Sequence, residues 1–127
     1  MFGDDAVSRS LGIELLEFGD GRSSASMRVT DSMVNGHAVV HGGYVFLLAE
    51  TAFAYACNSR GPATVTTGAE ISFVAAAEAG DLLIATAEER TRFGRNGIYD
   101  VTVRRGDTVI AEFRGRSRTS GRVEGEA

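Results

Sequence analysis

Lysine and tryptophan are absent from this chain, and cysteine and proline occur only once each. All 13 basic residues are therefore arginines, set against 17 acidic residues, and the formal net charge is −4. This balance argues against nucleic acid as a partner, because nucleic-acid-binding domains are basic. The single cysteine, Cys57, excludes a disulfide within the chain.

Long uncharged apolar segments are also absent. The most hydrophobic stretch runs from Tyr44 to Cys57, and Glu50 interrupts it. A membrane-spanning helix needs about 20 apolar residues, so we expect no membrane partner. The N-terminal stretch MFGDDAVSRSLG is acidic and lacks the apolar core of a signal peptide. We therefore expect a cytoplasmic protein.

The residues that are present have the composition of an ordinary globular domain. Of the 127 residues, 43% are hydrophobic and 24% are charged. This length predicts one domain with a core of its own. We place a single domain in residues 1–119 and expect residues 120–127 to form a flexible C-terminal tail.

Most of the chain has the sequence pattern of β-strands. IELLEF and RSSASMRVT flank a Gly-Asp-Gly turn and predict a hairpin. Four more strands are predicted after Pro62, at 64–74, 82–93, 97–105 and 108–119. The first ten residues predict a short helix. Residues 31–40 show no periodicity and predict a loop.

One long helix is predicted from His41 to Asn58. The segment is rich in Ala, Leu and Phe and has no proline, and a strand of this length would be exceptional. Apolar residues lie all round this helix, which predicts burial on every side. The predicted fold class is α+β, with a curved antiparallel sheet wrapped around one central helix. One sheet cannot cover every face of the helix, so we also expect an oligomer.

Glu50 and the pair Gly42-Gly43 are the first candidate functional residues. An ionised carboxylate in an apolar segment is costly, and such carboxylates have altered pKa values and serve in catalysis. The glycines stand where the predicted helix begins. Backbone N–H groups there lack partners within the helix and would stabilise a carbonyl oxygen that becomes negative. A solvated glutamate and a tight glycine turn are the structural alternatives.

Two other constellations are weaker candidates. His37 and His41, spaced four apart, could share a metal on a helix, but the segment predicts a loop and no third ligand is evident. A Cys57–His41 nucleophile pair would span four helical turns, and Cys57 suits a small core position. We therefore expect no metal site and no cofactor, with a structural or polarising role for His41.

The segment NGHAVVHGGYVFLLAETAFAYACNSRG resembles the signature of the hot dog fold acyl-CoA thioesterases of the PaaI (phenylacetyl-CoA thioesterase) type. The resemblance extends from about residue 11 to 119, and the pieces GD, YDV and FRGRS support it. It implies a hot dog fold, in which two protomers join their sheets edge to edge and dimers commonly pair into tetramers. It also implies active sites at the protomer interface and an acyl-CoA substrate.

The resemblance implies a role for individual residues. The Gly42 N–H would polarise the thioester carbonyl, and Glu50 would be the general base or nucleophile. The other implied catalytic residues are Asn35, Thr51 and His41. The implied substrate-binding residues are Gly43, Gly94, Arg95 and Asn96, with Arg60 as an alternative contact for the CoA phosphates. Where many relatives have Arg-Pro, this chain has Ala75-Ala76 after Phe73-Val74, which separates it from those relatives near the CoA channel.

The resulting hypothesis is an acyl-CoA thioesterase for aryl or arylacetyl groups, in the manner of phenylacetic acid degradation. One alternative is an acyl-CoA hydratase or dehydratase of the same fold, which would pair a histidine with a carboxylate. A second alternative is a non-catalytic acyl-CoA sensor, which would have no need of Glu50.

Overall fold

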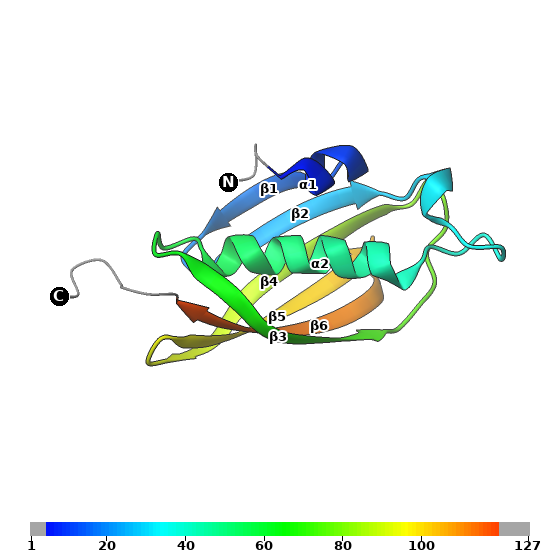
Figure 1. Ribbon diagram of the computed structural model, residues 1–127. Coiled ribbons are helices and arrows are strands. Elements are labelled where there is room, and N and C mark those ends of the chain that lie inside the picture. Colours follow the sequence, from blue (N-terminus) through cyan, green and yellow to red (C-terminus); the bar gives the residue numbers. More distant parts are fainter. Residues whose placement is uncertain (1–4, 120–127) are drawn as a thin grey trace.

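The computed structural model describes residues 5–119. Residues 1–4 of the predicted domain and the predicted tail 120–127 lie outside the described residues. The described chain has two α-helices, a 3₁₀ helix and six strands (Figure 1). In chain order they are α1 (Ala6–Leu11), β1 (Glu14–Gly19), β2 (Arg22–Arg28), the 3₁₀ helix (Asp31–Met33), α2 (Gly42–Cys57), β3 (Thr64–Phe73), β4 (Leu82–Phe93), β5 (Asn96–Arg105) and β6 (Thr108–Thr119).

The six strands form one antiparallel sheet in the order β1-β2-β4-β5-β6-β3. The predicted hairpins are confirmed, with β1 joined to β2 and β5 joined to β6 by tight turns. Gly106 in the second turn has a φ of 57°, a left-handed conformation that glycine adopts without strain. Strands β1 and β3 form the two edges of the sheet.

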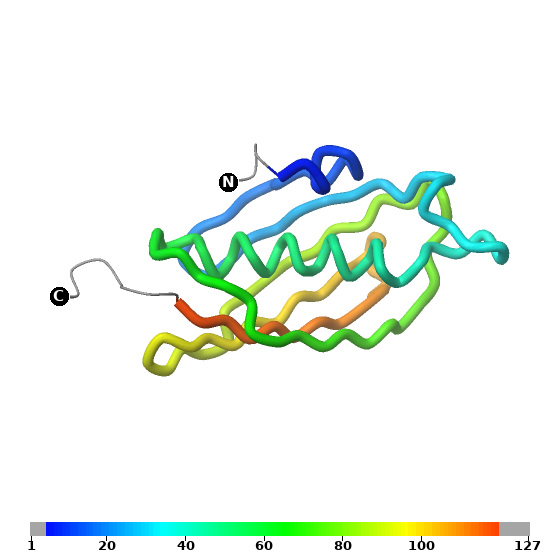
Figure 2. The backbone as a smooth tube through the Cα atoms, in the orientation of Figure 1, coloured from blue at the N-terminus to red at the C-terminus, as the bar shows by residue number. Residues whose placement is uncertain are grey.

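Helix α2 lies across one face of the curved sheet, as the hot dog resemblance implies (Figures 1 and 2). The sheet admits the helix because small residues line the surface beneath it, among them the fully buried Ala25, Ala85 and Ala111. Gly115 of β6 has the same role, because a Cβ there would lie 2.7 Å from the Phe53 ring of α2. The predicted fold class is thereby confirmed.

The prediction that α2 is buried on every side is wrong within one protomer. Leu48, Ala52 and Phe53 on the sheet side are fully buried. On the opposite side, Gly43 and Leu47 are exposed, and Glu50 and Ala54 are half-buried. These four positions are spaced by four, three and four residues, so they form one stripe along the helix. We call residues 43, 47, 50 and 54 the open stripe.

The loop prediction for residues 31–40 is correct in outline, with two local additions. The segment starts with the 3₁₀ helix and ends in an antiparallel bridge between Val34 and Val40. The short helix predicted near the N-terminus is confirmed as α1, which Asp5 caps through its side chain. No helix within residues 5–119 is long and apolar enough to span a membrane.

Candidate active site

Glu50 occupies the middle of α2 on the open stripe, where its carboxylate is half-buried. Its Oε2 accepts a 2.9 Å hydrogen bond from the hydroxyl of Thr66 on β3. Burial raises the pKa of Glu50, and the hydrogen bond from Thr66 opposes this increase. The carboxylate therefore stands at the surface of one protomer in an environment that makes it more basic than an ordinary glutamate.

The glycine pair lies at the N-terminus of α2, as predicted. His41 is the extended N-cap residue with an exposed side chain that makes no capping hydrogen bond, and Gly42 is the first helical residue. A Cβ at Gly42 would lie 2.6 Å from Cζ of Phe73, whereas one at Gly43 would meet open space. Glycine at position 42 thus permits close contact with the Phe73 ring, at the end of the helix where the first backbone N–H groups have no partner within it.

Asn35 shapes the loop that leads into α2. Its Oδ1 accepts hydrogen bonds from the backbone N–H groups of His37, at 2.8 Å, and Val39, at 3.2 Å. Between them, Ala38 has a positive φ of 63°, a conformation that needs such local support. The observed contacts of Asn35 are thus structural, and its action on water or on the carboxylate stays a prediction.

Thr51 is almost fully buried, and its hydroxyl donates a 2.7 Å hydrogen bond to the carbonyl of Leu47 in its own helix. The hydroxyl that contacts Glu50 belongs instead to Thr66, which the sequence reasoning missed. The signal available was the threonine-rich start of the strand after the helix. Which of its three hydroxyls (64, 66 and 67) would meet Glu50 depends on the register of β3 against α2, which is a tertiary property.

Within one protomer, Gly42 and Glu50 cannot act on the same carbonyl group. They are eight residues apart on a regular helix, which corresponds to about 12 Å along its axis. Both lie toward the side of α2 that the sheet leaves accessible. A carbonyl group placed on the Gly42 N–H would therefore need its carboxylate from another copy of the helix.

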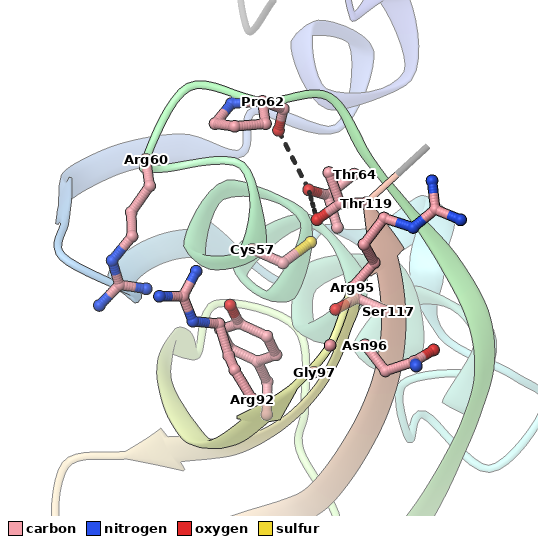
Figure 3. Close-up of a pocket in the computed structure, with 12 residues that line it drawn as sticks. Cys57, Arg60, Pro62, Thr64, Arg92, Arg95, Asn96, Gly97, Ser117 and Thr119 are labelled. Carbon is pink, nitrogen blue, oxygen red and sulfur yellow. Dashed lines mark hydrogen bonds between the residues drawn. The ribbon is translucent and has the colours of Figure 1, made fainter. Parts of the chain in front are cut away.

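The predicted CoA-binding residues come together at the C-terminal end of α2 (Figure 3). Arg60, Gly94, Arg95 and Asn96 line one small pocket, and Arg92 joins them as a residue that the sequence reasoning did not name. We call it the arginine pocket. Arg60 donates a 2.5 Å hydrogen bond to Glu89, and Nε of Arg92 lies 3.4 Å from the same carboxylate oxygen. Three arginines thus accompany one carboxylate, so the region has an excess of positive charge.

Two buried groups border the arginine pocket. Burial raises the pKa of the Cys57 thiol to about 12, and burial is also the main reason that the pKa of Tyr99 is raised to about 12. The Tyr99 hydroxyl donates a 3.2 Å hydrogen bond to Glu89. A protonated thiol is a poor nucleophile, and Cys57 lies about 22 Å along the helix from its N-terminus. The Cys57–His41 pair is therefore excluded within a protomer.

The histidine pair does not form a metal site in the described chain. His37 and His41 both precede α2, so their spacing of four does not place them on one helical face. Among residues 5–119, no cluster of three or more His, Cys, Asp or Glu side chains could hold a metal ion.

A second pocket lies beside the N-terminus of α2, with a volume of about 420 Å³. It is lined by apolar side chains and by the backbone of Gly42. Val40, Val45 and Ile110 form its buried floor, and Phe73 and Val74 stand at its rim. We call it the apolar pocket. The arginine pocket and the apolar pocket thus lie at opposite ends of α2, with Glu50 between them.

Comparisons with known proteins agree with this geometry. The family model of the thioesterase superfamily matches residues 37–112. A relative from Escherichia coli (strain K12), the acyl-coenzyme A thioesterase PaaI, is 43% identical over 129 residues, which covers 100% of this chain and 92% of the relative.

Solved structures give the same assignment. The E. coli PaaI protein from the phenylacetic acid degradation operon matches with a TM-score of 0.92 and 42% identity, over 95% of this chain and 88% of that one. A mutant of the phenylacetic acid degradation protein PaaI from Thermus thermophilus matches with a TM-score of 0.86 and 29% identity, over 90% and 98%. The chain therefore belongs to the thioesterase superfamily and has the hot dog fold.

Proposed function

We propose that this protein hydrolyses acyl-CoA thioesters to the free acid and CoA, at sites shared between two protomers. The observation that carries the proposal is the separation of Gly42 from Glu50 on one continuous helix, together with the open stripe on which Glu50 lies. The 43% identical relative is named as an acyl-CoA thioesterase, which supports the reaction class. The exposed apolar residues of the stripe support a partner helix.

A second copy of α2, packed antiparallel against the open stripe, would bring the two groups together. With the helices related by a two-fold axis, Gly42 of one protomer faces Glu50 of the other, and the arrangement repeats at the second site. The homodimer is the minimum active unit in this proposal, and a tetramer would be a pair of such dimers.

In the reaction, the carbonyl oxygen of the thioester accepts a hydrogen bond from the Gly42 N–H, at the positive end of the helix dipole. The ionised Glu50 either removes a proton from an attacking water molecule or attacks the carbonyl carbon to form a mixed anhydride. In the first route the C–S bond breaks as the C–O bond to water forms, and CoA thiolate takes up a proton. In the second, water then hydrolyses the anhydride and regenerates the carboxylate.

The arginine pocket would bind the phosphate groups of CoA. Cys57 follows Glu50 by seven residues, so the pocket lies two turns along the same side of α2, about 10.5 Å from the carboxylate. Arginine is suited to phosphate because its planar group presents several donors. The protomer that supplies Glu50 would therefore also hold the nucleotide end of the substrate. We propose aryl and arylacetyl thioesters as substrates, and a cytoplasmic location stays a prediction.

The proposal is tested with the purified protein and a panel of acyl-CoA thioesters, with release of free thiol as the readout. We expect rapid thiol release from phenylacetyl-CoA or benzoyl-CoA. Crotonyl-CoA hydration is followed in the same preparation, because a hydratase would add water to the double bond without releasing thiol. Hydration without thiol release would replace the proposed activity with that of a hydratase. Binding of acyl-CoA without either reaction would indicate a sensor.

A further inference from the structure

The apolar pocket has no part in the proposed chemistry so far, although it adjoins the proposed oxyanion site. Its floor is rigid, because Val40, Val45 and Ile110 belong to the hydrophobic core and are at most 8% exposed. Its walls are fixed by backbone hydrogen bonds. The Val74 N–H donates to the carbonyl of Ile110 at 2.8 Å, and the Val40 N–H donates to the carbonyl of Ala77 at 2.8 Å. The pocket is therefore preformed.

The rim of the apolar pocket is unusually exposed for its chemistry. Phe73 is 55% exposed and Val74 is 59% exposed, and both are large apolar side chains. Exposed apolar residues grouped around a concavity mark binding surfaces. No charged or polar side chain lines the pocket, so a charged group that entered it would lose its hydration without gaining a partner.

Phe73 connects this pocket to the proposed reaction site. The tip of its ring lies against the backbone of Gly42, so close that a Cβ on Gly42 would be 2.6 Å from Cζ. A group attached to a carbonyl carbon at the Gly42 N–H therefore begins at the mouth of the pocket. The arginine pocket of the same chain lies beyond the other end of α2, about 24 Å away along the helix axis. The two ends of a substrate would thus bind at separate places.

The size of the pocket is set by two small residues. Ala75 and Ala76 line it directly after the Phe73-Val74 rim. The volume of about 420 Å³ exceeds what one aromatic ring needs, since an apolar cavity of about 150 Å³ already holds benzene. Larger side chains at these positions would reduce the space next to the carbonyl carbon.

On the basis of the proposed function, we propose that the apolar pocket is the acyl-group site, that it selects uncharged apolar acyl groups of arylacetyl size, and that Phe73 and Ala76 determine this selectivity. The ring of an arylacetyl group packs against Phe73 in an offset or edge-on arrangement, which aromatic pairs prefer. Acyl groups that carry a second carboxylate, such as succinyl, are rejected because the pocket offers no polar partner.

The test compares kcat/KM for phenylacetyl-CoA, hexanoyl-CoA, acetyl-CoA and succinyl-CoA in the wild type and three variants. Ala76→Leu adds bulk at an exposed position, so it fills the pocket without overpacking the core. We expect the ratio of phenylacetyl-CoA to acetyl-CoA hydrolysis to fall at least tenfold. Phe73→Ala should lower the preference for phenylacetyl-CoA over hexanoyl-CoA. Ala79→Leu, at an exposed position of the same loop outside the pocket, should change neither ratio.

A binding measurement separates failure of this proposal from failure of the proposed hydrolysis. Phenacyl-CoA, a thioether that cannot be hydrolysed, should bind the wild type more tightly than CoA alone, and Ala76→Leu should remove that difference. If the difference is present but no thioester is hydrolysed, the acyl site stands and the hydrolase assignment fails. Unchanged ratios in Ala76→Leu and Phe73→Ala, succinyl-CoA hydrolysed as fast as phenylacetyl-CoA, or equal binding of phenacyl-CoA and CoA would each overturn the acyl-site proposal.

Discussion

The hydroxyl of Thr66 donates a 2.9 Å hydrogen bond to Oε2 of Glu50, which joins the middle of α2 to the edge strand β3. The bond stabilises the ionised carboxylate against the burial that raises its pKa. It also restricts the rotation of a side chain that has three rotatable bonds. Thr66 is therefore a positioning residue for Glu50 in the proposed reaction.

Removing this hydroxyl should alter the pH profile as well as the rate. In Thr66→Val the pKa of Glu50 rises further, so the acid limb of the kcat profile moves to higher pH. Thr66→Ser keeps the donor and should restore the wild-type limb. Thr102→Val is the matched control, because the Thr102 hydroxyl donates a comparable 2.7 Å hydrogen bond to Glu112 on the outer face of the sheet. A lower rate without any displacement of the acid limb would contradict the positioning role.

Glu50→Gln should preserve the fold and lower kcat by about 10²-fold or more, because glutamine is neither a base nor a nucleophile. Glutamine can still accept the hydrogen bond from Thr66. Glu112→Gln makes the same chemical change at a carboxylate with its own threonine donor, and should keep full activity. Wild-type turnover by folded Glu50→Gln would show that the carboxylate is not catalytic.

The same variant should be more stable than the wild type at neutral pH. Because the pKa of Glu50 is raised in the folded state, its protonated form contributes stability that is fully present below the unfolded pKa and is lost as the pH rises through the folded pKa. Glutamine does not ionise and loses nothing. Thermal unfolding should give equal Tm values for both proteins at acidic pH and a higher Tm for Glu50→Gln at pH 7. A lower Tm at pH 7 would mean that ionised Glu50 stabilises the fold.

The sequence predicted the fold well because local and tertiary preferences agree. Alternating strands with Gly-containing turns and a helix rich in Ala and Leu are read directly from the residues, and all six strands and α2 were found within a few residues of their ends. Gly42 and Glu50 were found from their chemistry, a glycine at a helix start and a carboxylate among apolar residues.

Other features of the site depend on packing that the sequence does not display. Thr66 and Thr51 are equivalent as hydroxyl groups, and only the register of β3 against α2 selects Thr66 as the partner of Glu50. Arg92 was missed because it joins the arginine pocket through the antiparallel pairing of β4 with β5. Burial of α2 was overestimated since an apolar pattern does not distinguish the core of one chain from an interface between two chains.

The arginine pocket makes a prediction about substrate affinity. Arg95→Ala should raise KM for acyl-CoA and leave kcat nearly unchanged, because a phosphate contact distant from the carbonyl acts equally on the ground state and the transition state. The effect should largely disappear with the acyl-N-acetylcysteamine thioester, which lacks the nucleotide. Arg118→Ala, an exposed arginine of β6 outside the pocket, is the control. Equal KM values for Arg95→Ala and the wild type would remove Arg95 from the site, and equal losses on both substrates would indicate misfolding.

The cross-protomer site predicts that two inactive variants restore activity when they share a dimer. Gly42→Pro removes the backbone N–H at the first helical position, where proline fits, and the extended His41 is compatible with a following proline. We expect a loss of about 10²- to 10³-fold, as for other oxyanion donors. Gly42→Ala introduces the same contact of a Cβ with Phe73 but keeps the N–H, so it separates the steric effect from the loss of the donor.

The decisive measurement uses heterodimers of Gly42→Pro with Glu50→Gln, purified through two different affinity tags after co-expression. If Gly42 and Glu50 of different protomers meet at each site, one site of the heterodimer carries both substitutions and the other carries neither. The heterodimer should then have roughly half the activity of the wild-type dimer, although both parent homodimers are nearly inactive. If each site were built from one chain, every site would contain one substitution, and the heterodimer would be as inactive as its parents. Sedimentation at micromolar concentration should show a dimer or tetramer, and an active monomer would exclude the shared site.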